Sequence, residues 1–248
     1  MPADRDARLG ASAAALLARK LALRSPLADE DRHALSALAI EEARINSRAH
    51  FVLEGERLSR SILLIEGYAA RYKVTAEGDR QIVSLHVSGD LIDLHSAILK
   101  VSDHNIAAFG PVRVGYLPHD AILSAVERYP GLARALWRDS LVDAAIEREW
   151  LLNVGQKDAF ARTAHLFCEV GMRLEAMGLA PRHRFVLPLA QHELADAVGL
   201  TAVHVNRTLQ RMRASGLITT HGSELCIEDW EALAEAGGFE PAYLYLPD

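Results

Sequence analysis

The sequence has very few cysteines and no long apolar stretch. Cys168 and Cys226 are the only cysteines among 248 residues, too few for a disulfide framework or a clustered iron–sulfur site. No segment approaches the roughly twenty apolar residues that a membrane helix needs. The N-terminal stretch MPADRDARLG carries charge from its start and is unlike a secretory signal. These absences predict a protein of the reducing cytoplasm with no membrane contact.

An excess of positive charge is also missing. The formal net charge is −6 at pH 7, which argues mildly against nucleic-acid binding, because phosphate-binding domains are usually basic. Acidic residues are nevertheless absent from Ala197 to Ser223, a window that contains Arg207, Arg211 and Arg213. DNA responds to the local field, so an acidic chain can still bind DNA through one basic window. Half of the residues are hydrophobic (50%), which favours a folded core over disorder.

The N-terminal half changes from helical to strand-like patterning. Ala- and Leu-rich spacing predicts short helices over 11–23 and 29–42, the second with Asp29 as its N-cap. Short apolar stretches then follow at 51–53, 62–65, 69–74, 82–87 and 112–117. They are separated by glycine-containing turns at 54–56, 66–67, 77–79 and 88–90. Strands at this regular spacing indicate a β-sandwich or barrel.

After Pro118 the pattern is helical again. Pro130 suits the first turn of a long helix that runs to about Val154 and is apolar on more than one face. Such a helix packs on its own domain and also on a partner copy, or else lies buried in one large core. We predict dimerisation through it, by Leu132, Leu136, Val142, Ile146 and Trp150. Gly155-Gln156 reads as a hinge, 158–177 as an amphipathic helix and 178–184 as a polar loop.

The segment from Leu189 to Ile227 has the pattern of a winged helix-turn-helix. A short helix over 191–198 and a second over 202–214 are joined by the turn Gly199-Leu200-Thr201. Thr201 is the expected N-cap of the second helix, and Val205, Leu209 and Met212 form its buried face. Strands 218–220 and 225–227, on either side of the turn at 221–224, would be the wing.

The other face of the second helix carries side chains suited to DNA. Arg can pair with guanine, and Asn or Gln with adenine, from the first turns of a recognition helix. The alternative is that these are ordinary solvated residues. We predict a DNA-binding set comprising Gln191, Thr201, Ala202, Val203, His204, Asn206, Arg207, Gln210, Arg211 and Arg213.

The order of strands, long helix and winged helix-turn-helix resembles the Crp/Fnr regulators, from about Ala43 to Ile227. The run 51–56 resembles the family's apolar stretch into Gly-Glu, 62–68 its next strand and turn, and Gly89-Asp90-Leu91-Ile92 its Gly-Asp-Phe/Leu-Ile element. Residues 191–212 and Gly216-Leu217-Ile218 resemble its DNA-reading motif. Each sensor motif alone is weak, but the set in this order is specific.

The resemblance implies an α+β protein with three parts. These are a β-roll sensor domain (jelly-roll-like, a double-stranded β-helix) with N-terminal helices over 1–129, a dimerisation helix over 130–155, and a winged helix-turn-helix domain over 156–248. It further implies a homodimer on a palindromic promoter site in double-stranded DNA, acting with RNA polymerase.

The departures from the family pattern concern the ligand and the DNA site. Cyclic-nucleotide-binding members hold the ribose with a Glu after Gly-Asp-Phe-Ile-Gly and the phosphate with an Arg-Ser pair. Here Asp93-Leu94 and Ser102-Asp103-His104-Asn105 stand at those places, so cyclic AMP binding is not expected. The N-terminal iron–sulfur cysteines of another branch are missing. Val203 replaces a common Glu of the recognition helix, which predicts altered half-site specificity.

Two other classes of function are compatible with parts of this sequence. A cyclic-nucleotide- or heme-binding sensor module is the main alternative, since heme-sensing relatives exist and the chain has 11 histidines. An enzyme on a cupin-like β-roll would need clustered His and carboxylate ligands. His86, Asp93, His95 and His104 are its only candidates, and their spacing matches no metal motif. We therefore predict no enzyme, no metal site and no assigned cofactor.

Overall fold

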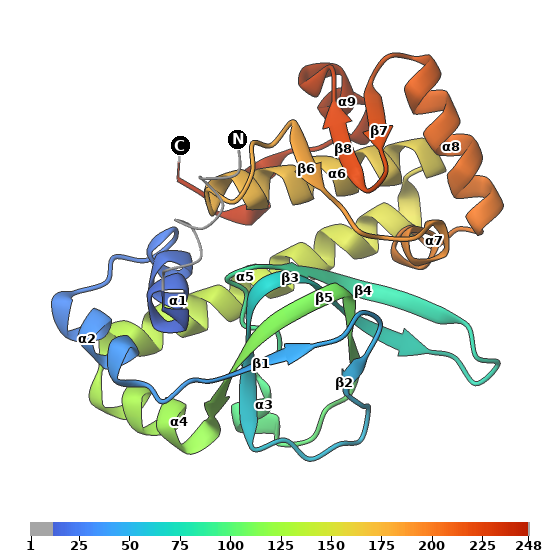
Figure 1. Ribbon diagram of the computed structural model, residues 1–248. Coiled ribbons are helices and arrows are strands. Elements are labelled where there is room, and N and C mark those ends of the chain that lie inside the picture. Colours follow the sequence, from blue (N-terminus) through green and yellow to red (C-terminus); the bar gives the residue numbers. More distant parts are fainter. Residues whose placement is uncertain (1–11, 248) are drawn as a thin grey trace.

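The computed structural model describes residues 12–247 and has the expected mixed α+β architecture, with a β-roll, a long helix and a C-terminal helix-turn-helix (Figure 1). None of the helices over 12–247 combines the length and the apolar character needed to cross a bilayer. The N-terminal half contains α1 (Ala13–Ala22), α2 (Asp29–Ala37), β1 (Glu41–Ile45), β2 (His50–Val52), β3 (Arg60–Val74), β4 (Arg80–Val87), α3 (Ser96–Leu99), β5 (Asn105–Pro118) and α4 (His119–Arg128).

The β-roll is built on two long strands. The strand order is β1-β5-β3-β4, all neighbours are antiparallel, and β2 also pairs with β5. The predicted turn at Glu66-Gly67 is wrong, because 62–65 and 69–74 belong to one strand. The pairing of β3 with β5 shifts register at Glu66, and Gly67 adopts a φ of 95°. A β-bulge bends this strand where the sequence suggested a reversal.

Two helix ends also differ from the sequence expectation. The helix predicted over 29–42 stops at Ala37, and Glu41 and Glu42 pair with β5 in β1. Asp29 is the first helical residue, and Ala28 occupies the N-cap. At the far end of the long helix, Gly155-Gln156 is its last turn and no hinge, because α5 runs from Pro130 to Gln156. The chain bends at Lys157 and Asp158, whose carboxylate caps α6 (Ala159–Ala176).

The C-terminal part is a three-helix unit with a small sheet. It contains β6 (Arg184–Val186), α7 (Gln191–Val198), α8 (Ala202–Ala214), β7 (Ile218–His221), β8 (Glu224–Ile227), α9 (Trp230–Gly237) and the 3-10 turn η2 (Pro241–Leu244). The sheet order is β6-β8-β7. The helix-turn-helix and the β7–β8 wing were expected, whereas β6, α9 and η2 were not.

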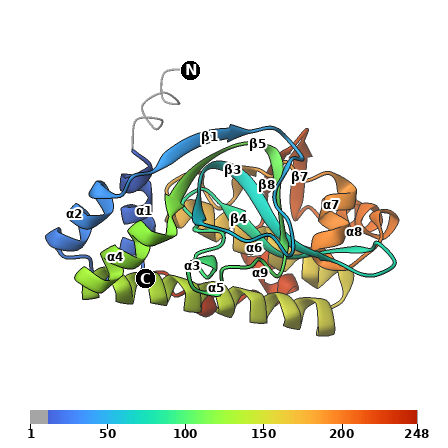
Figure 2. The same cartoon turned by 90° about the horizontal axis from the view of Figure 1, so that it is seen from below.

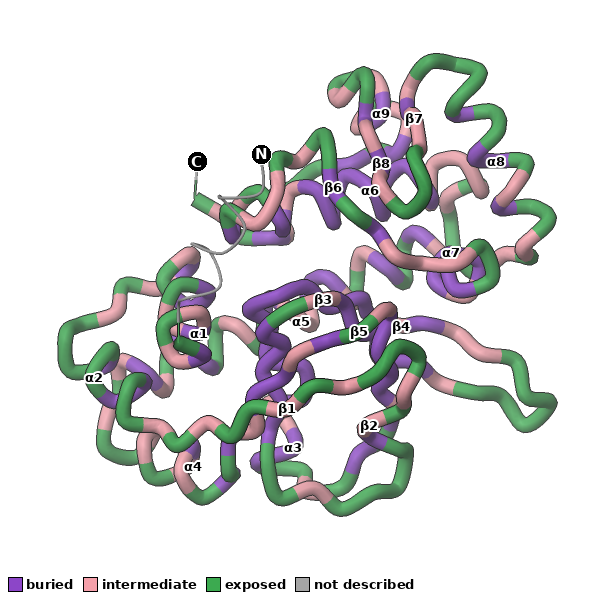
Figure 3. Tube along the Cα trace, viewed as in Figure 1, coloured by how far each residue is buried: buried purple, intermediate pink, exposed green. Residues whose placement is uncertain are grey.

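One apolar core joins the two halves. The long helix α5 runs the length of the molecule beside the β-roll (Figure 2), and α6 packs on both α5 and β4. Buried residues of the β-roll, such as Leu85 and Phe109, share a hydrophobic cluster with Leu194 and Val198 of α7. The tube view shows buried chain on the facing sides of β4 and α7, and exposed chain along the outer side of α8 (Figure 3). The helix-turn-helix of α7 and α8 therefore packs on the β-roll, with α8 facing outward.

Candidate nucleic-acid interface

The turn between α7 and α8 is shaped by one glycine and one threonine. Gly199 ends α7 in the left-handed region, with φ 64°. A Cβ there would approach Val154 to 3.1 Å, so the position favours glycine both by backbone angle and by space. Thr201 then caps α8, its hydroxyl accepting from the backbone N–H of His204 at 3.3 Å. These local signals fix the angle at which α8 leaves the core.

α8 is amphipathic in the predicted sense. Val205, Leu209 and Met212 are buried in the shared core, and Thr208 joins them, its hydroxyl donating to the carbonyl of His204. All ten residues of the predicted DNA-binding set lie outside the core. Ala202 and Asn206 are half-buried, and the exposed members are Gln191, Thr201, Val203, His204, Arg207, Gln210, Arg211 and Arg213. Nine of them follow one another on α8 and its cap, whereas Gln191 begins α7.

The three arginines of α8 differ in their surroundings. The guanidinium of Arg211 lies 5.1 Å from the ring centre of Phe160, and Arg213 donates from Nε to the hydroxyl of Thr220 at 3.2 Å. Those contacts tie the end of α8 to α6 and to the wing. Arg207 makes no hydrogen bond or ion pair with any residue in 12–247 and projects from the exposed face. Its side chain is therefore free to reach an external partner.

The five residues predicted to form the dimer contact are not on the exposed face of α5. Their side chains point into their own chain and are buried there: Leu132, Leu136, Val142, Ile146 and Trp150. The outer face of α5 instead exposes Trp137, Leu141, Leu151 and Leu152. Trp137, Leu141, Ala144, Arg148 and Leu151 are spaced alternately four and three residues apart. This is the spacing of a coiled-coil seam.

A cavity of about 480 Å³ lies between the β-roll and α5. Arg71, His95 and His104 line it from the β-roll, and Glu147 and Trp150 line it from α5. Arg71 donates to Glu147 at 2.6 Å, to Asp143 at 3.3 Å and to the carbonyl of Ile92. Sequence reasoning missed Arg71, although a charge inside the apolar run 69–74 was a signal.

Of the two aspartates at the places of the family's ribose and phosphate contacts, Asp93 and Asp103, only one lines this cavity. Asp103 lines it. Asp93 is buried instead and accepts from the backbone N–H of Ile62 at 2.7 Å. Burial raises the pKa of Asp93 to about 6. Burial, reinforced by Arg71, lowers the pKa of His95 to about 4, so this imidazole is neutral at pH 7.

A β-roll that carries a winged helix-turn-helix on a long helix defines a DNA-binding transcription regulator. The profile of the Crp-like helix-turn-helix domain matches residues 161–236. The chain is similar to the fumarate and nitrate reduction regulatory protein of Yersinia pestis, with 27% identity over 185 residues, covering 74% of this chain and 73% of that protein. The Escherichia coli K12 protein of the same name is 24% identical over 184 residues. Together these likenesses support a transcription regulator of the Crp/Fnr type with a Crp-like helix-turn-helix domain.

Solved structures share this fold. FixK2 from Bradyrhizobium japonicum superposes with a TM-score of 0.74 at 22% identity, covering 80% of this chain and 98% of FixK2. A CRP-family transcriptional regulator of Thermus thermophilus, TTHB099, gives a TM-score of 0.61 at 20% identity, covering 79% and 96%. At these identities the likeness establishes the architecture, and the residues that recognise DNA must be argued from this chain.

Proposed function

We propose that two copies of this chain bind a palindromic promoter site, each reading one half-site with α8. The observation that carries this is the outward face of α8, where Asn206, Arg207 and Gln210 stand together in a window free of acidic residues. Such side chains pair with adenine and guanine edges in the major groove. Bound at a promoter, the dimer would act on RNA polymerase as a regulator and not as an enzyme.

The three arginines of α8 are assigned different roles because their contacts within the chain differ. Arg207 is free and lies one turn after Val203, the place for a bidentate contact to guanine O6 and N7. Arg211 and Arg213 are held by Phe160 and Thr220 near the wing. We assign them to phosphate contacts, which position the protein without reading sequence.

Binding selections from random duplexes test this assignment. Arg207→Ala should cost about 1–3 kcal/mol per half-site and relax the guanine preference at one symmetric position. Arg213→Ala should weaken all sequences alike and reduce the slope of affinity against salt by about one. Arg32→Ala, an exposed arginine of α2, is the control. An unchanged base preference in Arg207→Ala, with affinity merely lowered, would refute base recognition by Arg207.

The dimer is proposed to form along α5. The partner would cover the exposed seam of Trp137, Leu141 and Leu151, which otherwise leaves large apolar side chains in water. The inward-facing residues named from sequence would support the helix from within.

Cyclic AMP is not the proposed ligand of the cavity. Arg71 is the nearest cation for a phosphate, but its guanidinium is held by Glu147 and Asp143. A phosphate that bound Arg71 would have to displace Glu147 and Asp143 from its guanidinium, which offsets the gain from the new ion pair. Calorimetric titration of the full chain should show no micromolar affinity for cyclic AMP. Such affinity would favour the cyclic-nucleotide alternative, and a Soret band in purified protein the heme alternative.

A further inference from the structure

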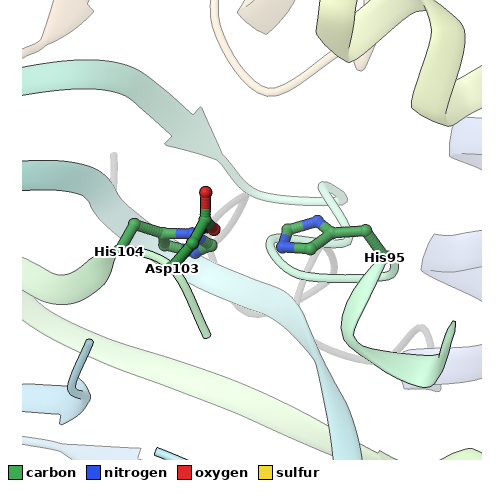
Figure 4. Close-up of side chains that lie close together, drawn as sticks. All are labelled: His95, Asp103 and His104. Carbon is green, nitrogen blue, oxygen red and sulfur yellow. Dashed lines mark hydrogen bonds and ion pairs between the residues drawn. The ribbon is translucent and has the colours of Figure 1, made fainter. Parts of the chain in front are cut away.

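Two histidines and an aspartate that are separate in sequence meet at the wall of the cavity. His95 precedes α3, whereas Asp103 and His104 lead into β5 (Figure 4). One potential ligand atom from each lies within 4.8 Å of the others. The imidazole rings face one another with centroids 5.3 Å apart and planes inclined by 56°. We propose that these three residues form a binding site for one divalent transition-metal ion.

The ring geometry fits a shared ion. Two imidazoles bound to one tetrahedral ion, with metal–nitrogen distances of about 2.1 Å, have centroids roughly 5 Å apart. Imidazole nitrogen together with carboxylate oxygen is a donor set suited to zinc, iron(II), cobalt(II) or nickel(II), whereas calcium and magnesium prefer oxygen alone. Two imidazoles and one carboxylate would therefore bind a first-row divalent transition-metal cation.

An unpaired nitrogen gives independent support. His104 is 4% exposed, and its Nε2 has no hydrogen-bond partner among residues 12–247. Its Nδ1 lies 2.7 Å from a carboxylate oxygen of Asp103. Hydrogen bonding of Nδ1–H to that oxygen leaves Nε2 unprotonated. The Asp103 side chain is 82% exposed, so its carboxylate can turn from Nδ1 to the ion when one binds. A buried acceptor without a donor is costly, and a metal ion would satisfy it.

The charges around the site permit a cation. Arg71 lines the same cavity, but Glu147 and Asp143 bind its guanidinium. Lys73 likewise pairs with Glu54. Three protein ligands leave a coordination position open, as in zinc sites that bind an exchangeable molecule. Trp150 and Leu151 of α5 form the opposite wall, so a molecule taking that position would touch the long helix.

The test is metal binding by the full-length chain, free of affinity-tag histidines and stripped with chelator. Cobalt(II) titration followed by visible absorption, and zinc(II) titration by calorimetry, should give one ion per chain. His95→Ala, His104→Ala and Asp103→Asn should each weaken affinity at least tenfold and reduce the rise in melting temperature that zinc produces. His33→Ala, an exposed histidine of α2, should change nothing.

Asp103→Asn guards against loss of folding, because that side chain is 82% exposed and circular dichroism should be unchanged. Three results would overturn the proposal. They are no binding by the wild-type chain, full affinity in any of the three variants, or equal loss in His33→Ala. The measurement needs no DNA, so it stands or falls separately from the proposed DNA recognition.

Discussion

Val203 is the large apolar side chain that α8 exposes, with 63% of its surface in solvent. On a recognition helix such a group suits the methyl of thymine, whereas the carboxylate common at this place in the family accepts from cytosine. We expect Val203→Glu to shift preference at one symmetric position from thymine to cytosine. Selection from random duplexes measures this, with Val74→Glu, an exposed valine at the end of β3, as the control. An unchanged profile would place Val203 away from the bases.

Asp90 lies where three parts of the chain meet. It accepts from Arg173 of α6 at 2.5 Å and from the backbone N–H of Val87, and it pairs with Lys20 of α1. All three charged side chains are buried. Asp90→Asn leaves the buried Lys20 without its counter-ion and leaves Arg173 with Glu169 as its one carboxylate partner. We expect it to lower the free energy of unfolding by about 3 kcal/mol or more at pH 7.

The pH dependence of that loss has a definite sign. Burial alone would raise the pKa of Asp90, but Lys20 and Arg173 outweigh it and hold the pKa well below its usual range. A carboxyl whose pKa is depressed on folding stabilises the protein above its unfolded pKa, about 3.9, and this contribution is lost as pH falls through the folded pKa. The difference between wild type and Asp90→Asn in urea unfolding should thus be full above pH about 5 and shrink below it. A difference that grows on acidification contradicts this account.

At the scale of elements, the outer face of α5 is the feature to test. Leu141 is 54% exposed at the centre of the seam, and Leu53 is 54% exposed in the loop after β2. Because a buried charge in a dimer seam must lose its hydration, Leu141→Glu should weaken dimerisation and DNA binding together. Leu53→Glu, equally exposed in the monomer, should affect neither. Sedimentation at micromolar concentration decides the matter: a monomeric wild type, or a dimeric Leu141→Glu, would exclude this seam.

The elements also show where sequence reasoning succeeds. α7 and α8 have the predicted bounds, because a glycine and a threonine that act locally set their ends. The turn at Glu66-Gly67 was wrong, because a bulge and a reversal carry the same glycine signal and only pairing with β5 separates them. The inward burial of Ile146 and the meeting of His95 with His104 depend on tertiary packing. Spacing along the chain does not contain that information.

At the scale of the whole molecule, the β-roll and the C-terminal helix-turn-helix domain share one hydrophobic core. Tyr68 donates to the carbonyl of Val186 at 2.5 Å, and Arg80 pairs with Asp196 at 2.7 Å. We expect calorimetry of the full chain to show one unfolding transition. The calorimetric enthalpy per cooperative unit should equal the van't Hoff enthalpy. Arg80→Ala, which removes a half-exposed pair, should lower stability by about 1 kcal/mol or less without splitting the transition. Two resolved transitions in the wild type would contradict a common core.

The length of α5 has a mechanical consequence. Its 27 residues form one uninterrupted rod of about 40 Å, since an α-helix rises about 1.5 Å per residue. A pivot of about 5° at one end of such a rod displaces the other by about 3.5 Å, close to the rise of about 3.4 Å between stacked base pairs. A pivot of α5 by a few degrees would thus displace its far end by about one base-pair step. Because α7 packs on β4 in the shared core, a pivot of α5 would move α8 relative to its half-site only if the contacts between α7 and β4 shifted as well.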